Sequence, residues 1–427
     1  MTALTLTLRQ PAQLGDRPRD DFVLTTMGHL PGAAVRGALA AAWIEVNGEP
    51  SGQKRAEFLR LFEGGVRFGA LLRPGTEFDS LAVVRHKYEP ADTCQVVDYD
   101  RAAGDIPPAR CNDRDCDSPL EPARPGLFLD NDEDAPAIRR RTSVAIGESG
   151  VARRGQLFTR ETLLPDQRFT GTLVADDPAD LTALQELGRV RIGGRRTTHG
   201  LADIAISEDA PPQEPQQLNG TTLVLRLRTP GIFTDEFGRP YPEPGHAELT
   251  RILGCKAWVE RRWTRWQEAG GWHAASGLPK PAELAVAAGS AFLIRTERTV
   301  ATADLQRLAR RGVGLRRHEG FGDLAGPPHL RDGMAAKQER QRHARELRDA
   351  AAPLFGVPVR FPRRWPELRS LLAGHAAAGA AADTDAARRL RAAADAFPDP
   401  VVAAALRAFL SLPAGDAAAM AEELGRS

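Results

Sequence analysis

The sequence lacks the features of several common protein classes. Its 427 residues include only four cysteines, which are too few for a disulfide-stapled scaffold and favour a reducing compartment. Basic and acidic residues nearly balance, with a formal net charge of +1, so any site for a polyanion must be a local patch. No glycine-rich loop is followed by Lys-Ser or Lys-Thr, so nucleotide hydrolysis has no support.

The sequence also shows no cleavable signal and no membrane span. Its first residues alternate apolar and polar side chains, with Leu4, Leu6 and Leu8 on one face, which predicts a half-buried strand. We therefore expect a cytoplasmic protein without membrane contact. With 42% hydrophobic residues the chain can bury a large core, and at roughly 150 residues per domain its length suggests two or three domains.

The stretch Gly312–Leu324 holds four glycines around two arginines and a histidine, directly after a predicted helix over Thr302–Arg310. Glycine adopts positive φ without a steric penalty and lets another backbone approach closely. Such a loop can offer backbone N–H groups and cations to a phosphate chain, although a plain turn with solvated arginines is the alternative. The candidate binding residues here are Gly312, Gly314, Arg316, Arg317, His318 and Gly320.

An imperfect second copy of this stretch spans Ile192–Ile204 and follows its own predicted helix over Asp180–Leu187. The matched positions, with one gap, are Gly193 with Gly314, the Arg195–Arg196 pair with Arg316–Arg317, and Gly200 with Gly320. Two copies of helix, glycine-arginine loop and apolar strand predict a duplicated module.

The expected strands and helices divide the chain into three parts. Residues 1–210 contain strand, helix, strands, helix, glycine-rich loop and strand, with a long insert at 89–137, and residues 219–328 repeat that order. This duplication predicts an α+β fold with two ferredoxin-like (RRM-like, βαββαβ) modules. Residues 333–427 are alanine-rich and predict an all-α C-terminal domain.

The insert at 89–137 is rich in aspartate, proline and arginine and contains three of the four cysteines. Cys111 and Cys116 have a knuckle-like spacing, and a structural zinc ion needs about four thiolate or imidazole ligands in tetrahedral array. Cys94 and His86 are the residues that would complete such a set. The alternative is a degenerate knuckle that holds no metal.

The duplicated loop, together with Leu30–Leu39 and Leu61–Phe68, resembles the RAMP superfamily of CRISPR-associated proteins. The segment Arg141–Ile146 followed by Ala152–Arg160 is similar to a RAMP subunit of type III-D effector complexes. The resemblance covers residues 1–326 and implies a pair of ferredoxin-like folds that bind guide RNA (crRNA) within a multisubunit, RNA-guided antiviral ribonucleoprotein.

In such complexes a two-module subunit caps the 5′ tag of the crRNA and contacts the large polymerase-like subunit and the backbone RAMP subunits; target RNA is contacted indirectly. A single RNA strand is held by cations along its phosphates and by stacking on its bases. The further RNA-binding candidates are Arg36 on the first helix, Arg141, Arg153 and Arg154 beside a predicted protruding hairpin, and Arg195 and Arg196 in the first loop.

Two rival functions stay open. Backbone subunits of type III complexes cut target RNA with a loop aspartate and a divalent metal. The insert offers many such carboxylates, namely Asp92, Asp98, Asp100, Asp113, Asp115 and those of Asp130–Asp134. We expect no catalytic residue, because acid-rich loops are usually solvated surface. The other rival is a protein-only scaffold, in which the arginines are solvated.

Overall fold

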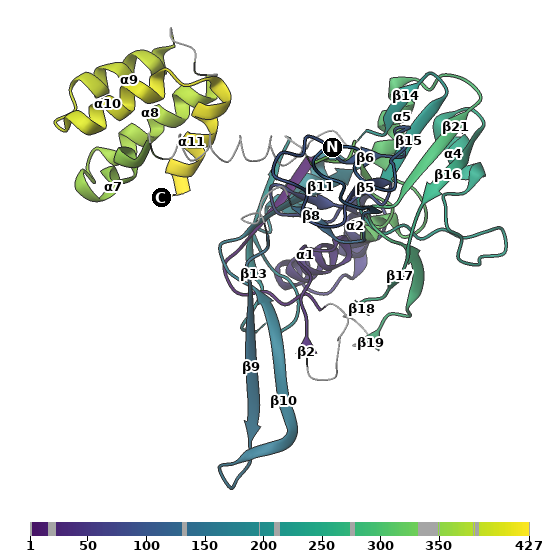
Figure 1. Ribbon diagram of the computed structural model, residues 1–427. Helices are drawn as coiled ribbons and strands as arrows, with labels where there is room; N and C mark the ends of the chain where they lie inside the picture. The colour runs from purple at the N-terminus through teal and green to yellow at the C-terminus, as the bar shows by residue number, and fades with distance from the viewer. Residues whose placement is uncertain are drawn as a thin grey trace. The chain divides into compact units, whose positions relative to one another are not determined.

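The structure is a computed structural model of the chain (Figure 1). It describes residues 2–15, 23–129, 135–195, 197–208, 214–273, 278–331, 349, 351–378, 380 and 384–426. The chain forms two compact units, one containing two large sheets and the other containing the C-terminal helices. Within the described ranges, no helix has the length and apolar character needed to cross a membrane.

The first sheet is antiparallel and has five strands. In spatial order these are β12 (Arg189–Arg191), β13 (Leu201–Ser207), β1 (Thr2–Leu8), β11 (Arg168–Ala175) and β3 (Val66–Phe68). The helices that alternate with them are α1 (Gly32–Asn47), α2 (Gly52–Glu63) and α3 (Pro178–Gln185). Numbered along the chain, β13-β1-β11-β3 is the 4-1-3-2 order of a ferredoxin-like βαββαβ module.

The second sheet repeats this order. Its strands are β14 (Gln216–Asn219), β15 (Thr222–Leu227), β21 (Ala291–Thr296) and β16 (Ala257–Trp263), and β22 (Leu324–Ala325) pairs with the end of β15. Its helices are α4 (His246–Leu253) and α5 (Thr302–Arg311). Because β22-β15-β21-β16 is again 4-1-3-2, the predicted α+β fold with two ferredoxin-like modules is confirmed.

The alternation at the N-terminus produces the first core. Leu4, Leu6 and Leu8 lie on one face of β1 and are buried together with Trp43 of α1 and Phe169 of β11. Successive strand residues point to opposite faces, so every second leucine reaches the same hydrophobic layer. The second module has an equivalent cluster between its sheet and helices α4 and α5.

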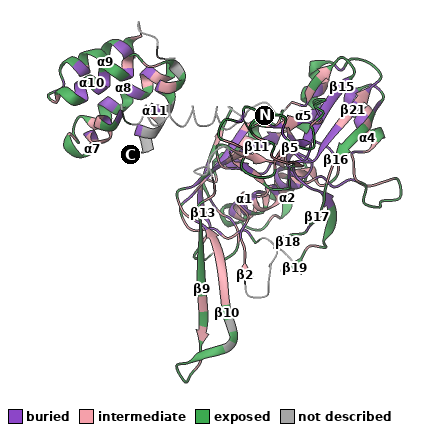
Figure 2. Ribbon diagram, in the orientation of Figure 1, coloured by how far each residue is buried: buried purple, intermediate pink, exposed green. Residues whose placement is uncertain are grey.

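A long hairpin extends from the first module (Figure 1). Its strands are β9 (Ile138–Ile146) and β10 (Ala152–Leu163), and the short β2 (Val23–Leu24) pairs with β10 near the hairpin base. Most of β9 is exposed, as Figure 2 shows. An exposed two-stranded ribbon of this length has no core of its own, so its side chains are available to a ligand or partner.

The insert forms small sheets instead of an aperiodic loop. Strand β5 (Val83–His86) pairs with β6 (Tyr99–Asp100) and β7 (Leu120–Pro122), and β4 (Thr76–Phe78) pairs with β8 (Leu127–Leu129). Strands of two to four residues leave no readable alternation. Their pairing is visible only in three dimensions.

The second module carries two further hairpins, and the C-terminal unit is helical. The hairpin strands are β17 (Trp266–Ala269) with β20 (Glu283–Val286), and β18 (Trp272–His273) with β19 (Leu278–Pro279). The described C-terminal helices are α7 (Val357–Arg360), α8 (Trp365–Ala377), α9 (Asp385–Asp395), α10 (Pro400–Leu410) and α11 (Ala414–Arg426). Leucines and alanines of these helices form a separate core.

Candidate functional site

The two glycine loops lie at equivalent places, after the second helix and before the last strand of each module. Their backbones match at the positions that the sequence aligns. The φ angles are 84° at Gly193 and 81° at Gly314, 54° at Arg195 and 52° at Arg316, and 81° at Gly200 and 86° at Gly320. Positive φ is unusual for arginine, so its presence at the same aligned position in both loops indicates one repeated loop geometry.

The second loop packs at the junction of the two modules. A Cβ at Gly320 would lie 2.2 Å from the carbonyl oxygen of Phe68 and 3.0 Å from Cα of Gly32, so only glycine fits there. Arg67 of β3 crosses the same junction and donates to Asp323 at 2.9 Å and to the carbonyl of Ala309 at 3.4 Å. The second glycine loop therefore lies in the contact between the two sheets.

The backbone N–H groups of this loop have internal acceptors. Gly312 donates to the carbonyl of Leu308 at 2.8 Å, and Gly320 donates to the carbonyl of Arg317 at 2.9 Å. The N–H of Gly314 donates to both carboxylate oxygens of Glu248, at 3.0 and 3.1 Å. These three N–H groups therefore already have acceptors within the fold, and their contact with phosphate stays a prediction.

The charged side chains of the loop are also partly neutralised. Arg316 donates to Glu319 at 2.8 and 3.2 Å and to Glu283 at 3.0 Å, and Glu319 also accepts from Lys280 at 2.7 Å. Burial lowers the pKa of His318, so its imidazole is neutral at pH 7. Arg316 is therefore paired with carboxylates, and His318 adds no positive charge at pH 7; their contact with RNA stays a prediction.

Glu319 makes the stability of this contact sensitive to acid. Burial opposes its ionisation, but hydrogen bonds from Arg316 and Lys280 outweigh that effect and lower its pKa from 4.5 to about 2. The stabilisation is thus complete above pH 4.5 and is lost as the pH falls toward 2. Glu319→Gln should cost about 2 kcal/mol at pH 7 in urea unfolding. That difference should shrink between pH 5 and pH 3; a constant difference would contradict this account.

One face of the β9–β10 hairpin carries free cations. Arg139 and Arg141 alternate on β9, and Arg160 on β10 lies directly opposite Arg141. The guanidinium of Arg160 stacks at 4.9 Å on the ring of Phe158. Burial and the nearby charge of Arg195, from the first glycine loop, lower the pKa of Arg160.

We call Arg139, Arg141, Arg160 and Arg195 the hairpin cluster. Among the described residues, none of the four forms an ion pair with a carboxylate, and the buried Nε of Arg160 has no hydrogen-bond acceptor. Like charges gathered without counter-charges repel one another, so an anion that binds between them is favoured. The structure thus brings the predicted Arg141 and Arg195 together.

The opposite face of the same hairpin differs in charge. Arg140 donates to Glu161 at 2.6 and 3.1 Å and is neutralised there. Toward the tip, Val144 pairs with Leu157, and both are exposed. The hairpin is therefore cationic on one face and neutral to apolar on the other.

The other predicted arginines have different environments. Arg36 donates to the carbonyl of Phe62 at 2.7 Å and to Glu63 at 2.9 Å, with a side chain only 15% exposed. It joins α1 to the end of α2, and its contact with RNA stays a prediction. Arg153 is exposed in β10. The side chain of Arg154 and the whole of Arg196 lie outside the described residues.

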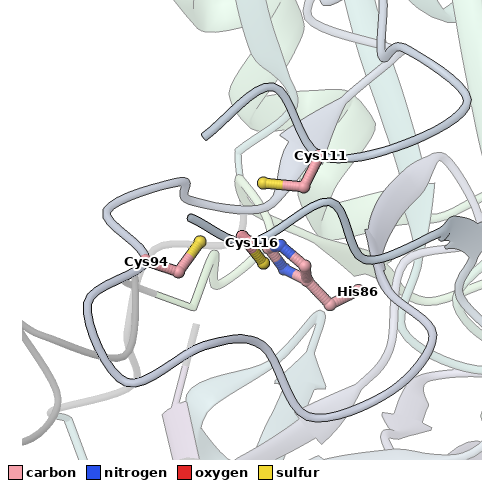
Figure 3. A group of neighbouring side chains, drawn as sticks. All are labelled: His86, Cys94, Cys111 and Cys116. Carbon is pink, nitrogen blue, oxygen red and sulfur yellow. The ribbon is translucent and has the colours of Figure 1, made fainter. Parts of the chain in front are cut away.

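The structure also brings together the four predicted metal ligands. His86, Cys94, Cys111 and Cys116 each offer one ligand atom, and these atoms all lie within 4.8 Å of one another (Figure 3). Three thiols and one imidazole are the donor set of a common tetrahedral zinc site. This cluster could hold a metal ion.

The insert aspartates are mostly engaged in structural pairs. Asp100 is buried and paired with Arg226 of β15. Asp98 is buried between Arg85 at 3.4 Å and Arg331 at 3.3 Å. Neither carboxylate faces solvent, whereas Asp92 does.

Comparison with known proteins found a family model that matches part of the chain. The family model described as "CRISPR-associated protein (Cas_Cmr3)" matches residues 121–326. No curated protein matches the chain.

Three similar solved structures illustrate the range of matches. A chain of the type III-B Cmr-beta complex bound to cognate target RNA is 10% identical, with a TM-score of 0.39, covering 77% of this chain and 99% of that one. A chain of the Csm3–Csm4 subcomplex of a type III-A interference complex is 12% identical, with a TM-score of 0.35 and coverages of 70% and 94%. A Cas6-related protein from Pyrococcus furiosus is 8% identical, with a TM-score of 0.27 and coverages of 76% and 97%.

The family match covers residues 121–326, slightly less than half of the chain, and includes the second ferredoxin-like module.

Proposed function

We propose that the chain is a CRISPR-associated RAMP protein, that it is the guide-RNA-binding subunit of a type III complex of subtype III-D, and that it caps the 5′ tag of the crRNA. Its partners would then be the backbone RAMP subunits and the large polymerase-like subunit. The observation that carries the RNA-binding part is the hairpin cluster, in which arginines from β9, β10 and the first glycine loop lie close together and form no ion pair with a carboxylate in the described part of the chain.

The chemistry of this face suits a single strand of RNA. Guanidinium groups bind phosphate oxygens, and an aromatic ring or a stacked arginine offers a platform to an unpaired base. Arg160 and Phe158 supply both features within one stacked pair. Arg139 and Arg141, two residues apart on β9, extend the cationic surface along the hairpin.

Replacing Arg139 and Arg141 together with alanine should weaken binding of a crRNA-derived RNA about tenfold. Each lost phosphate contact on a single strand also lowers the magnitude of the salt slope by about 0.7, so the slope should fall by about 1.4. Fluorescence anisotropy of the full chain at several salt concentrations measures both. Both side chains are exposed, so the fold should be unaffected.

Arg140→Ala is the matched control, because it removes the same side chain from the same strand on the opposite face. Its guanidinium is already paired with Glu161, so RNA affinity should change by less than about twofold. Equal effects of the two variants would contradict a specific cationic face. An unchanged affinity in the double variant would favour the scaffold function.

The four-residue His/Cys cluster leads to a second proposal, which is structural. We propose that His86, Cys94, Cys111 and Cys116 hold a zinc ion that organises the loops of the insert. Structural zinc sites use four such ligands and no open position, so this ion would support folding and take no part in chemistry on RNA.

A further inference from the structure

A second group of cations lies where the two modules meet. Arg67 comes from β3, Arg251 from the last turn of α4, Arg310 and Arg311 from the last turn of α5, and Arg317 from the second glycine loop. We call these five residues the junction cluster. Arg307 ties the two helices together by donating to the carbonyl of Ile252 at 2.7 and 3.1 Å.

Two guanidinium groups in the cluster keep a buried N–H without an acceptor. Nη2 of Arg67 donates to Asp323, but its Nη1 makes no hydrogen bond within the described part of the chain. Nη1 of Arg317 lies 3.7 Å from Glu248, which is beyond hydrogen-bond distance, and is likewise buried without an acceptor. A buried donor without an acceptor is unfavourable, so an anion that accepts hydrogen bonds from both donors is favoured.

The charges around Arg317 are mostly positive, which also favours a bound anion. Burial lowers the pKa of Arg317, and the charges of Arg311, Arg67 and Arg251 lower it further against the opposing effect of Glu248. The carboxylate of Glu248 also accepts from the N–H of Gly314, so it does not fully neutralise the guanidinium of Arg317. Arg251, Arg310 and Arg311 are exposed, and none of them forms an ion pair with another described residue.

Helix electrostatics explain only part of this arrangement. The C-terminal turn of a helix favours cations, which accounts for Arg251 in α4 and for Arg310 and Arg311 in α5. It does not account for the unsatisfied donors of Arg67 and Arg317, which reach the same place from a strand of the first module and from the glycine loop.

We propose that the junction cluster binds a phosphate group of the RNA strand that the hairpin cluster holds, which links the strand to both modules at once. This inference rests on the proposed function. The ligand is a phosphate because it presents several oxygens to converging guanidinium groups, the geometry in which arginine recognises anions. The source is either a phosphate within the strand or the phosphate at its 5′ end.

The test is Arg310→Ala with Arg311→Ala in the full chain. The control is Arg388→Ala with Arg389→Ala, a second adjacent and exposed arginine pair on a helix, α9. The probes are one crRNA-derived RNA made with a 5′-phosphate and with a 5′-hydroxyl. We expect the first variant to bind about tenfold more weakly, with the magnitude of the salt slope reduced by about 0.7 for the one lost phosphate contact, and the control to match the wild type.

Each outcome decides something. Equal losses with both RNAs assign the cluster to a phosphate within the strand, and a loss only with the 5′-phosphate RNA assigns it to the strand end. If the Arg310/Arg311 variant keeps the RNA affinity and salt slope of the wild type, the inference is overturned. It is overturned too if that variant keeps RNA binding but loses an acidic protein partner. The Arg139/Arg141 variant distinguishes failure of this inference from failure of the proposed function. If that variant loses RNA binding and the junction variant does not, only this inference fails. If neither variant loses RNA binding, the proposed function fails too.

Discussion

Asp100→Ala should destabilise the protein by about 3–5 kcal/mol, because it removes one partner of a buried ion pair. The guanidinium of Arg226 on β15 is 2% exposed and the carboxylate of Asp100 is 4% exposed. Burial lowers the pKa of Arg226, yet arginine stays charged at any ordinary pH. Its remaining acceptor, Gln216 at 3.1 Å, is neutral and cannot offset the charge. Urea unfolding measures the loss.

A double substitution sharpens this test. Asp100→Leu with Arg226→Met removes both charges, and apolar replacement of a buried pair is often close to neutral. The double variant should therefore be more stable than Asp100→Ala alone. Asp92→Ala, at an exposed position, is the control and should change stability by less than about 0.5 kcal/mol. A cost below 1 kcal/mol for Asp100→Ala would mean that water reaches Arg226.

This pair also bears on the rival nuclease function. Loss of target cleavage in an Asp100→Ala variant would not identify a catalytic carboxylate, because the substitution also destabilises the fold. The same holds for Asp98, which is buried between Arg85 and Arg331. Asp92 is thus the substitution at which the nuclease function can be tested without a change of fold.

Cys111→Ser should abolish metal binding and unfold the loops of the insert. Structural zinc sites bind with an apparent free energy of about 10–16 kcal/mol, and loss of one thiolate removes a quarter of the ligand set. Mass spectrometry of the purified chain should find one zinc ion in the wild type and none in the variant. A chelator should lower the melting temperature of the wild type and leave that of the variant unchanged.

Cys255→Ala is the matched control for this substitution. Cys255 is a buried cysteine too, but it lies in the core of the second module and outside the His/Cys cluster. Its variant should keep the metal. A wild-type chain that carries no zinc after purification and gains no stability when zinc is added would identify the cluster as an empty knuckle.

The sequence alone predicted the features that depend on local patterns. Alternating leucines in Thr2–Leu8 predicted the first strand, because strand periodicity is two. The two glycine-arginine stretches predicted a repeated module, since positive φ at matched positions restricts residue choice. Cys111 and Cys116, with Cys94 and His86, predicted the ligand set whose atoms the structure gathers.

Only the tertiary structure decided which of the many arginines are free. Arg316 and Arg36 look as available in the sequence as Arg141, but each donates to an acceptor distant along the chain, Arg316 to Glu283 and Arg36 to the carbonyl of Phe62. Strand register places Arg160 opposite Arg141, and the packing of one module on the other places Arg67 beside Asp323. Neither placement is readable from the sequence. The physical reason is that charge belongs to a residue type, whereas its neutralisation depends on contacts between residues far apart in the chain.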